Sequence, residues 1–131
     1  MDKKIAVVIC NFNKKDYVMQ CIASVFAQDL HGISVYVVDN ASTDGSSEEI
    51  SRKFKDKVNL IRNFENLGGS GGFNTGIREA LKWDYPYIYL LDNDVILDSK
   101  ALSELVDYLE SHPQTAIAGS AIYSMDCPDE L

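Results

Sequence analysis

The sequence contains no long hydrophobic run. Its start leads into only six apolar residues, Ile5–Cys10, which is too short for the apolar region of a signal peptide or for a transmembrane helix. We therefore expect a cytoplasmic protein. Attachment to the inner face of a membrane through segments outside this sequence stays open.

Cysteine and histidine are scarce. The three cysteines, Cys10, Cys21 and Cys127, form no CxxC pair, and none has metal-ligand spacing to His31 or His112. An odd number of scattered thiols is typical of a reducing compartment. We expect Cys10 and Cys21 to pack as small apolar side chains, and both histidines to be surface residues.

Basic residues are few. The chain has 12 Lys and Arg against 20 Asp and Glu, a net charge of −8. Nucleic acid is excluded as a partner because its binding needs clustered Lys and Arg. A protein this acidic must hold a phosphate through a metal ion, backbone N–H groups or a local basic residue.

What the sequence does contain is a regular alternation of short apolar runs with segments of helical period. Strands are expected at Ile5–Cys10, Ile33–Val38, Val58–Ile61, Tyr87–Leu91 and Ala116–Ala118. Helices are expected between Lys15 and Gln28, from a capping box at Ser46 and Glu49, from Asn74 to near Trp83, and over Leu102–Leu109.

This alternation predicts parallel strands with right-handed crossovers and helices on both faces of the sheet. The fold class is therefore α/β, a Rossmann-like three-layer α/β/α sandwich with a mostly parallel sheet. At 131 residues the chain has the size of one domain. Its tail, Ser120–Leu131, brings no closing helix, so we expect a domain that lacks its C-terminal part.

The most informative motif is the tripeptide Asp92-Asn93-Asp94, directly after the apolar run Tyr87–Leu91. Ligands of open α/β sheets bind outside the carboxyl ends of the strands. Two carboxylates placed there suit Mg²⁺ or Mn²⁺ that grips a diphosphate. The alternative is that Asp and Asn only make a turn.

Polar residues follow the other strands as well. Asp39 is placed to read a nucleotide base or ribose, or else to form an Asx-turn. The glycine-rich segment Gly68–Gly76 fits neither a P-loop nor a dinucleotide fingerprint. Its glycines allow close approach of a ligand, with Asn74 capping the next helix, or they form a flexible structural turn. Lys14 and Lys15 are expected to be solvated.

Four segments together resemble a known family. Val7–Asn13 resembles the opening strand of family-2 glycosyltransferases with the GT-A fold, and Val37–Ser46 resembles their second-strand motif. Asn66–Gly76 is similar to the glycine-rich segment of the rhamnosyl- and galactofuranosyltransferase branch. Leu90–Asp94 is similar to the family's DxD motif. The segments occur in the family's order and span nearly the whole chain.

The resemblance implies a single nucleotide-sugar-binding domain over residues 1–131. It implies inverting, metal-dependent transfer from a UDP- or dTDP-sugar to a saccharide or lipid-linked saccharide acceptor, in the synthesis of cell-surface polysaccharide. The cation, Mn²⁺ or Mg²⁺, would be held by Asp92 and Asp94. The donor would be bound by Asn11, Phe12, Asn13, Asp39, Asn66, Gly68, Gly69, Gly71, Gly72, Asn74 and Asp92.

The chain departs from the family's pattern at three places. Phe73 stands where many members have an arginine, which puts one basic phosphate contact in doubt. Asn93 stands where another aspartate is common, and this leaves the outer two carboxylates intact. No residue matches the family's catalytic carboxylate, so the base is expected from a segment beyond Leu131.

Other classes fit less well. A signalling receiver domain would need acidic residues after strands one and three and a lysine after strand five. Its positions hold Cys10–Asn11, Arg62–Asn63 and Gly119–Ser120. A nucleotidyltransferase would need a glycine- and arginine-rich loop at Asn11–Lys14. A nucleotide-sugar-binding fragment or a degenerate transferase without activity remains as the alternative.

Overall fold

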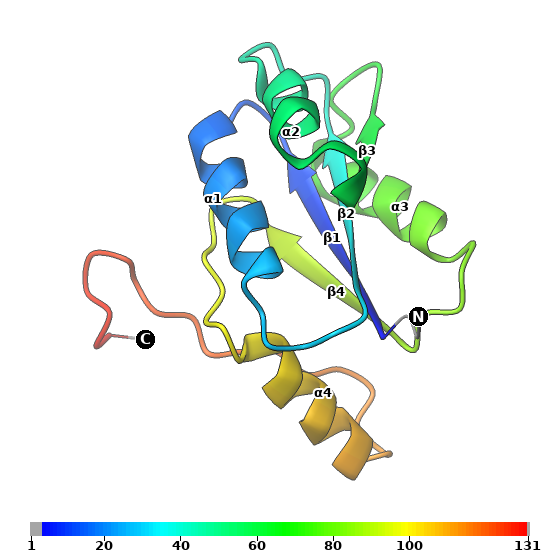
Figure 1. The fold of residues 1–131 in the computed structure, drawn as a ribbon, viewed down its shortest axis with the longest axis vertical. Helices are drawn as coiled ribbons and strands as arrows, with labels where there is room; N and C mark the ends of the chain where they lie inside the picture. Colours follow the sequence, from blue (N-terminus) through cyan, green and yellow to red (C-terminus); the bar gives the residue numbers. More distant parts are fainter. Residues whose placement is uncertain (1–3, 131) are drawn as a thin grey trace.

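A computed structural model describes residues 4–130 of the chain (Figure 1). Residues 1–3 and 131, the two ends of the expected domain, lie outside the described residues. The strands are β1 (Ile5–Asn11), β2 (Ile33–Asp39), β3 (Val58–Arg62) and β4 (Tyr87–Asp92). The helices are α1 (Lys15–Phe26), α2 (Ser46–Phe54), the 3-10 turn η1 (Lys55–Lys57), α3 (Gly68–Ala80) and α4 (Ala101–Ser111).

The four strands form one sheet in the order β3-β2-β1-β4. All neighbouring pairs are parallel, with Ile5 of β1 opposite Ile33 of β2 and Tyr87 of β4. The parallel arrangement predicted from the alternating pattern is confirmed. The chain adds β2 and β3 on one side of β1 and then crosses to add β4 on the other side. The carboxyl ends of β1 and β4 therefore form a topological switch point, the usual place for a ligand.

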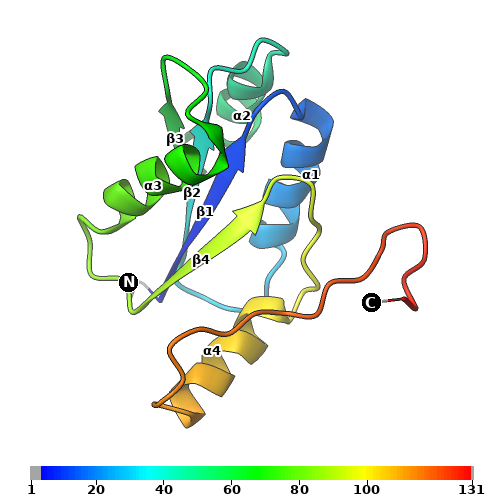
Figure 2. The same ribbon diagram turned by 180° about the vertical axis from the view of Figure 1, so that it is seen from behind.

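Helices cover both faces of the sheet, as expected for a three-layer sandwich. α1 and α2 lie on one face in Figure 1, and α3 lies on the opposite face, seen from behind in Figure 2. Side chains of β1 alternate between these layers: Val7 and Ile9 belong to the α1 side, and Ala6 and Val8 to the α3 side. Both faces of β1 are buried, which explains its continuous apolar sequence.

The expected fifth strand is wrong. Residues 116–118 form no strand, and β4 is an edge of the sheet in the part of the chain described. Two of the three residues are alanines, which have low strand propensity. The third, Ile117, is 88% exposed. The segment therefore buries too little apolar surface to pair with β4.

The expected glycine-rich turn before a helix is also wrong. The glycines form the first half of α3, which begins at Gly68, so Asn74 lies inside the helix and does not cap it. Low helix propensity of glycine suggested a turn, but tertiary packing overrides it. A Cβ on Gly72 would lie 2.1 Å from Cys10 Sγ, and one on Gly76 would lie 2.3 Å from Val8 Cγ1. The glycines let α3 approach β1 closely.

The capping box expected at Ser46 and Glu49 does not form. Ser46 is the first residue of α2, and the N-cap position is held by Gly45, which has no side chain to make a capping bond. Glu49 instead forms an ion pair with Arg52 at 2.6 Å. The N–H of Ser46 donates to Asp44 Oδ1 at 3.0 Å. The start of α2 is thus held by Asp44, the residue before the glycine.

Candidate functional site at the switch point

The polar residues that end the strands lie together at one edge of the sheet. The strand arrowheads in Figure 1 point toward this edge. β1 ends at Asn11 and β2 at Asp39, and these two residues are direct partners in the strand register. Cys10 of β1 is the partner of Asp92 in β4. The structure thus brings three of the predicted site residues, Asn11, Asp39 and Asp92, to the switch point.

A chain of hydrogen bonds crosses this edge from β4 to β2. Asn93 Nδ2 donates to Asn11 Oδ1 at 2.9 Å, and Asn11 Nδ2 donates to Asp39 Oδ1 at 3.0 Å. The backbone N–H of Ser42 donates to the second oxygen, Asp39 Oδ2, at 3.0 Å. Asn11 and Asp39 are buried. Asp39 forms the turn contact that was the alternative interpretation, and each of its oxygens retains a lone pair for a ligand.

The loops after β1 and β2 are joined to each other. The N–H of Asn13 donates to Ser42 Oγ at 2.9 Å, and the N–H of Thr43 donates to Asn13 Oδ1 at 2.7 Å. Asn13 has a positive φ of 49°, which asparagine tolerates better than most residues. Phe12, between the two anchored residues, is 44% exposed. The result is a fixed wall with one aromatic ring open to a ligand.

The start of α3 lies on the same face of the sheet as Asp92. Because Gly72 packs directly against Cys10, and Asp92 is the register partner of Cys10, all three share the α3 side of the sheet. Burial first, and then the charges of Asp39 and Asp92, raise the pKa of the Cys10 thiol. The first turns of α3 therefore lie on the same side of the sheet as Asp92.

A second chain of hydrogen bonds fixes where α3 begins. Asn63 Nδ2 donates to Asn40 Oδ1 at 2.8 Å, and Asn40 Nδ2 donates to the carbonyl of Gly68 at 3.0 Å. Gly68 has a φ of +73°, and a Cβ on Gly69 would meet nothing within 4 Å. The four predicted glycines thus have different surroundings. Gly72 packs on the sheet, Gly71 lies against the Leu67 side chain, and Gly68 and Gly69 leave the helix start open.

Asp94 forms an ion pair with a lysine of the same chain. Lys14 Nζ lies 2.7 Å from Asp94 Oδ2, and the two side chains are 46% and 42% exposed. The hydrogen bond from Lys14 lowers the pKa of Asp94 and raises that of Lys14. Lys14 was expected to be solvated, and no feature of the sequence pairs it with a residue 80 positions away. The pair indicates that the Asp94 carboxylate is oriented to accept positive charge.

The loop that carries Asp94 is anchored to α1 and to Gln28 just after it. The N–H of Leu97 donates to Ser24 Oγ at 3.1 Å, and Gln28 Nε2 donates to the carbonyl of Asp98 at 2.7 Å. The N–H of Leu102 donates to Gln28 Oε1 at 3.0 Å. Ser24 of α1 and Gln28, two residues beyond the end of that helix, thus hold the segment between β4 and α4 in place.

The residues present fit a divalent cation shared with a ligand. No group of three or more His, Cys, Asp and Glu side chains within residues 4–130 could hold a metal by itself. Asp92 and Asp94 are both exposed, and they offer two hard oxygen donors. Mg²⁺ typically takes one or two carboxylates and completes its coordination with substrate phosphates and water. The donor set therefore suits a cation that binds together with a diphosphate.

Two other predicted donor-binding residues lie just before α3 and inside it. Asn66 Oδ1 accepts the N–H of Gly68 at 2.9 Å and supports the turn into α3. Asn74 is exposed and lies inside α3. The polar side chains at this edge that sequence reasoning left out of the site are Lys14, Asn40, Ser42, Asn63 and Asn93. The only sequence feature that points to these five residues is their position shortly after the strands.

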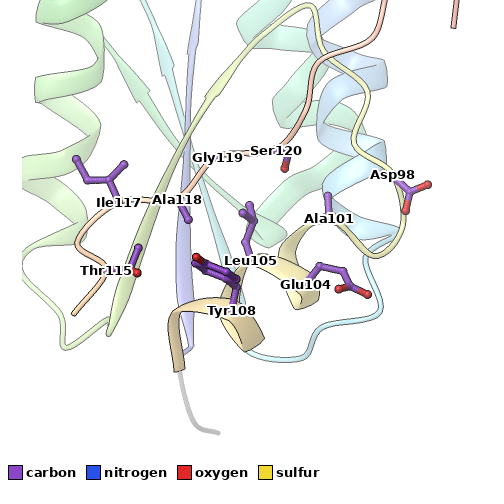
Figure 3. A pocket seen from close by; sticks show the side chains of 10 residues that line it. All are labelled: Asp98, Ala101, Glu104, Leu105, Tyr108, Thr115, Ile117, Ala118, Gly119 and Ser120. Carbon is purple, nitrogen blue, oxygen red and sulfur yellow. The ribbon is translucent and has the colours of Figure 1, made fainter. Parts of the chain in front are cut away.

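A hollow of about 610 Å³ lies elsewhere, between α4 and residues 115–120 (Figure 3). It is lined by Leu105 and Tyr108 of α4 and by Ile117 and Ala118 of the tail. In Figure 1, α4 lies at the end of the molecule opposite to the strand arrowheads. None of the predicted site residues lines this hollow.

Among the described residues, no helix has the length and apolar character needed to cross a membrane.

Comparison with known sequences identifies relatives along nearly the whole chain. Residues 6–131 match the sequence pattern of glycosyl transferase family 2. An uncharacterized glycosyltransferase of Nostoc sp. is 32% identical over 112 residues, which cover 82% of this chain and 33% of that protein. The poly(ribitol-phosphate) β-N-acetylglucosaminyltransferase TarP of Staphylococcus aureus is 25% identical, over 89% of this chain and 36% of its own. The chain spans about a third of the length of these two relatives.

Solved structures share the fold. The TarS 1-349 structure of S. aureus in complex with UDP-GlcNAc superposes with a TM-score of 0.72 at 22% identity, over 92% of this chain and 37% of that one. The mannosyltransferase PcManGT of Pyrobaculum calidifontis, in complex with GDP-Man and Mn²⁺, gives a TM-score of 0.77 at 20% identity, over 95% and 36%. These likenesses establish the GT-A transferase fold. Together with the match over residues 6–131, they lead to one conclusion: the chain belongs to glycosyl transferase family 2.

Proposed function

We propose that this chain is the donor-binding part of a metal-dependent, inverting glycosyltransferase that acts in the synthesis of cell-surface polysaccharide. The donor is a UDP- or dTDP-sugar and the acceptor a saccharide or lipid-linked saccharide. The observation that carries the proposal is the convergence of Asn11, Asp39 and the Asp92–Asp94 motif at the switch point of the sheet. A catalytic base toward the acceptor would come from a segment outside this sequence.

The nucleoside would bind on the β1–β2 side of this edge. Asp39 keeps acceptor capacity for an N–H of the base or a hydroxyl of the ribose. Asn11 holds that carboxylate in place, and the joined loops around Asn13 keep the wall rigid. The exposed ring of Phe12 offers an apolar surface beside the base. Preorganisation of this kind reduces the ordering cost of binding.

The diphosphate would bind between β4 and the start of α3. Gly69 and Ser70 lie in the first turn of α3, where backbone N–H groups lack partners within the helix and favour negative charge. Gly68, whose own N–H is bound by Asn66, and Gly71 would border the same phosphates. Asp92 and Asp94 would hold Mn²⁺ or Mg²⁺ against the same phosphates. Such a cation, when bound, supplies neutralisation of the departing diphosphate.

The glycine-rich start of α3 supports a finer assignment, to the rhamnosyl- and galactofuranosyltransferase branch. In this chain the glycines at Gly72 and Gly76 are required by packing against β1.

The three free thiols, of which Cys127 is exposed, support a reducing compartment and hence the cytoplasm.

Calorimetry with this chain tests the proposal. UDP, dTDP and GDP are titrated with and without Mn²⁺, and we expect at least one to bind in a Mn²⁺-dependent manner. Asp92→Asn and Asp94→Asn should each weaken that binding by at least about tenfold, since even partners of metal ligands commonly contribute that much. Asp107→Asn, an exposed change on α4, is the charge-matched control. Absence of nucleotide binding, or unchanged Mn²⁺ dependence in Asp94→Asn, would refute the proposal.

A further inference from the structure

Lys14 occupies a position that the proposed function does not explain. Its ammonium group forms a 2.7 Å ion pair with the carboxylate assigned to the divalent cation, Asp94. The backbone of Lys14 is held because its carbonyl accepts the N–H of Val18 in the first turn of α1. Only the flexible side chain reaches across to the loop after β4.

Lys14 and a divalent cation would compete for the Asp94 carboxylate. A divalent cation bound to Asp94 would lie within a few ångströms of the Lys14 ammonium if the ion pair persisted. Like charges at that distance repel each other, although solvent screens this exposed pair. The acidic motif around the pair, with Asp92 as its second carboxylate, attracts both cations. Binding of the metal therefore favours movement of Lys14 away from Asp94.

A phosphate of the donor is a suitable new partner for the released ammonium group. A diphosphate between the acidic motif and the start of α3 would lie beside Asp94, within reach of the long side chain of Lys14. Arg62, the basic residue at the end of β3, already donates to Ser47 and Ser51. Phe73 of α3 packs in the apolar cluster beneath the helix and brings no charge. Lysine is a flexible point charge that suits phosphate.

We propose that Lys14 is an exchange residue: it neutralises Asp94 until a divalent cation takes its place, and it then binds a phosphate of the donor. This inference rests on the proposed function. It predicts that the divalent cation alone binds weakly, because it must displace Lys14 without compensation. It also predicts that cation and nucleotide strengthen each other's binding, because the nucleotide gives the displaced ammonium group a new partner.

The test measures two affinities in matched variants. Lys14→Gln removes the ion pair, and Lys15→Gln makes the same change of charge one residue away, where the structure places no bond to Asp94. The first titration uses Mn²⁺ alone. Exposed ion pairs are weak, so we expect Lys14→Gln to bind Mn²⁺ about two- to fivefold more tightly than Lys15→Gln does.

The second titration uses UDP at saturating Mn²⁺. Here Lys14→Gln should bind several-fold more weakly than wild type, Lys15→Gln should match wild type, and Lys14→Arg should restore most of the affinity. Equal behaviour of Lys14→Gln and Lys15→Gln in both titrations overturns the role of Lys14 while the proposed function stands. Failure of the wild-type chain to bind UDP with Mn²⁺ overturns both.

Discussion

Asn93 and Asn11, 82 residues apart in the sequence, are joined by a hydrogen bond of 2.9 Å from Asn93 Nδ2 to Asn11 Oδ1. The direction of this hydrogen bond follows from the next bond in the chain, which joins Asn11 to Asp39. Asp39 as a carboxylate only accepts, so Asn11 must turn its NH₂ group toward Asp39 and its carbonyl oxygen toward Asn93. Residue 93 must therefore be a donor.

This polarity predicts the effect of Asn93→Asp. The new carboxylate would face the carbonyl oxygen of Asn11. Turning the Asn11 amide around would only move the conflict to Asp39, because Asn11 would then have an acceptor on each side and a single NH₂ group. We expect the free energy of unfolding to fall by about 1–3 kcal/mol, the typical cost of an unsatisfied buried polar group. Urea unfolding monitored by circular dichroism measures the change.

Two controls separate this effect from general charge repulsion. Gln114→Glu adds the same charge at an exposed position and should leave stability within about 0.5 kcal/mol of wild type. Raising the salt to about 1 M screens repulsion between exposed carboxylates but does not restore a donor to Asn11. If salt removes the whole deficit of Asn93→Asp, the fixed polarity of the bond is wrong.

Gly72 and Gly69 of α3 offer a test of why the helix is rich in glycine. Gly72→Ala would place a Cβ 2.1 Å from Cys10 Sγ, so we expect it to destabilise the protein by about 1–3 kcal/mol through overpacking. The new Cβ of Gly69→Ala would meet nothing within 4 Å. This substitution should be neutral or stabilise the protein by up to about 1 kcal/mol, because alanine favours the helix. Thermal unfolding compares the two variants.

A second substitution tests whether the contact with Cys10 causes the loss of stability in Gly72→Ala. Cys10→Ala removes the sulfur that the new methyl group would contact, so the double variant should recover part of the stability lost in Gly72→Ala. Recovery should be incomplete because Asn40 Nδ2 would remain 2.8 Å from the new Cβ. Equal stabilities of Gly72→Ala and Gly69→Ala would contradict the packing role of these glycines.

The framework of the fold could be predicted from the sequence because it depends on short-range patterns. The apolar runs at β1 and β4 and the helical stripe of α4 identified their elements within a residue or two. The start of α3 could not be predicted. Glycine disfavours helices on its own, and the need for it arises only when α3 meets Cys10 and Val8 of β1. That contact is a property of the assembled layers.

The candidate site shows the same division. The rule that ligands bind at the carboxyl ends of strands identified Asn11, Asp39 and Asp92 without any knowledge of the strand order. Contacts between residues far apart in the sequence could not be predicted. Nothing near Lys14 in the sequence points to Asp94, and nothing near Asn93 points to Asn11. Whether β4 lies next to β1 decides both contacts, and only the sheet order provides that information.

The three thiols should differ in reactivity. Burial raises the pKa of Cys21 to about 12, so almost none of it is thiolate at about pH 8. Cys10 is partly buried with a raised pKa, and Cys127 is exposed. We expect iodoacetamide to label Cys127 first, Cys10 slowly and Cys21 last, as followed by mass spectrometry over time. In concentrated urea, which unfolds the chain, the three rates should converge. Rapid labelling of Cys21 in the folded chain would contradict its burial.

Asp44 connects the starts of two helices, and its titration should appear in the pH dependence of stability. The N–H of Lys15, at the start of α1, donates to Asp44 Oδ2 at 2.9 Å, and the N–H of Ser46, at the start of α2, donates to Oδ1 at 3.0 Å. Burial acts to raise the pKa of Asp44, but the hydrogen bonds from Ser46 and Lys15 outweigh it, so that the pKa lies below its usual value of 3.8.

A lowered pKa in the folded state means that the folded chain favours the charged carboxylate. Its contribution to stability is therefore complete well above about pH 4 and is lost as the pH falls through the folded-state pKa. At about pH 7, Asp44→Ala should cost about 1–2 kcal/mol, the usual cost of losing a helix cap. The difference from wild type should shrink steadily between about pH 5 and about pH 2.

Urea unfolding at several pH values measures this difference directly. Asp126→Ala, an exposed change outside the helices and strands, is the control and should stay within about 0.5 kcal/mol of wild type at about pH 7. Comparing each variant with wild type at the same pH cancels the titration of all other carboxylates. A difference for Asp44→Ala that is the same at neutral and at strongly acidic pH would mean that its side chain packs in this site without its charge contributing, and the link between the two helix starts would then be steric.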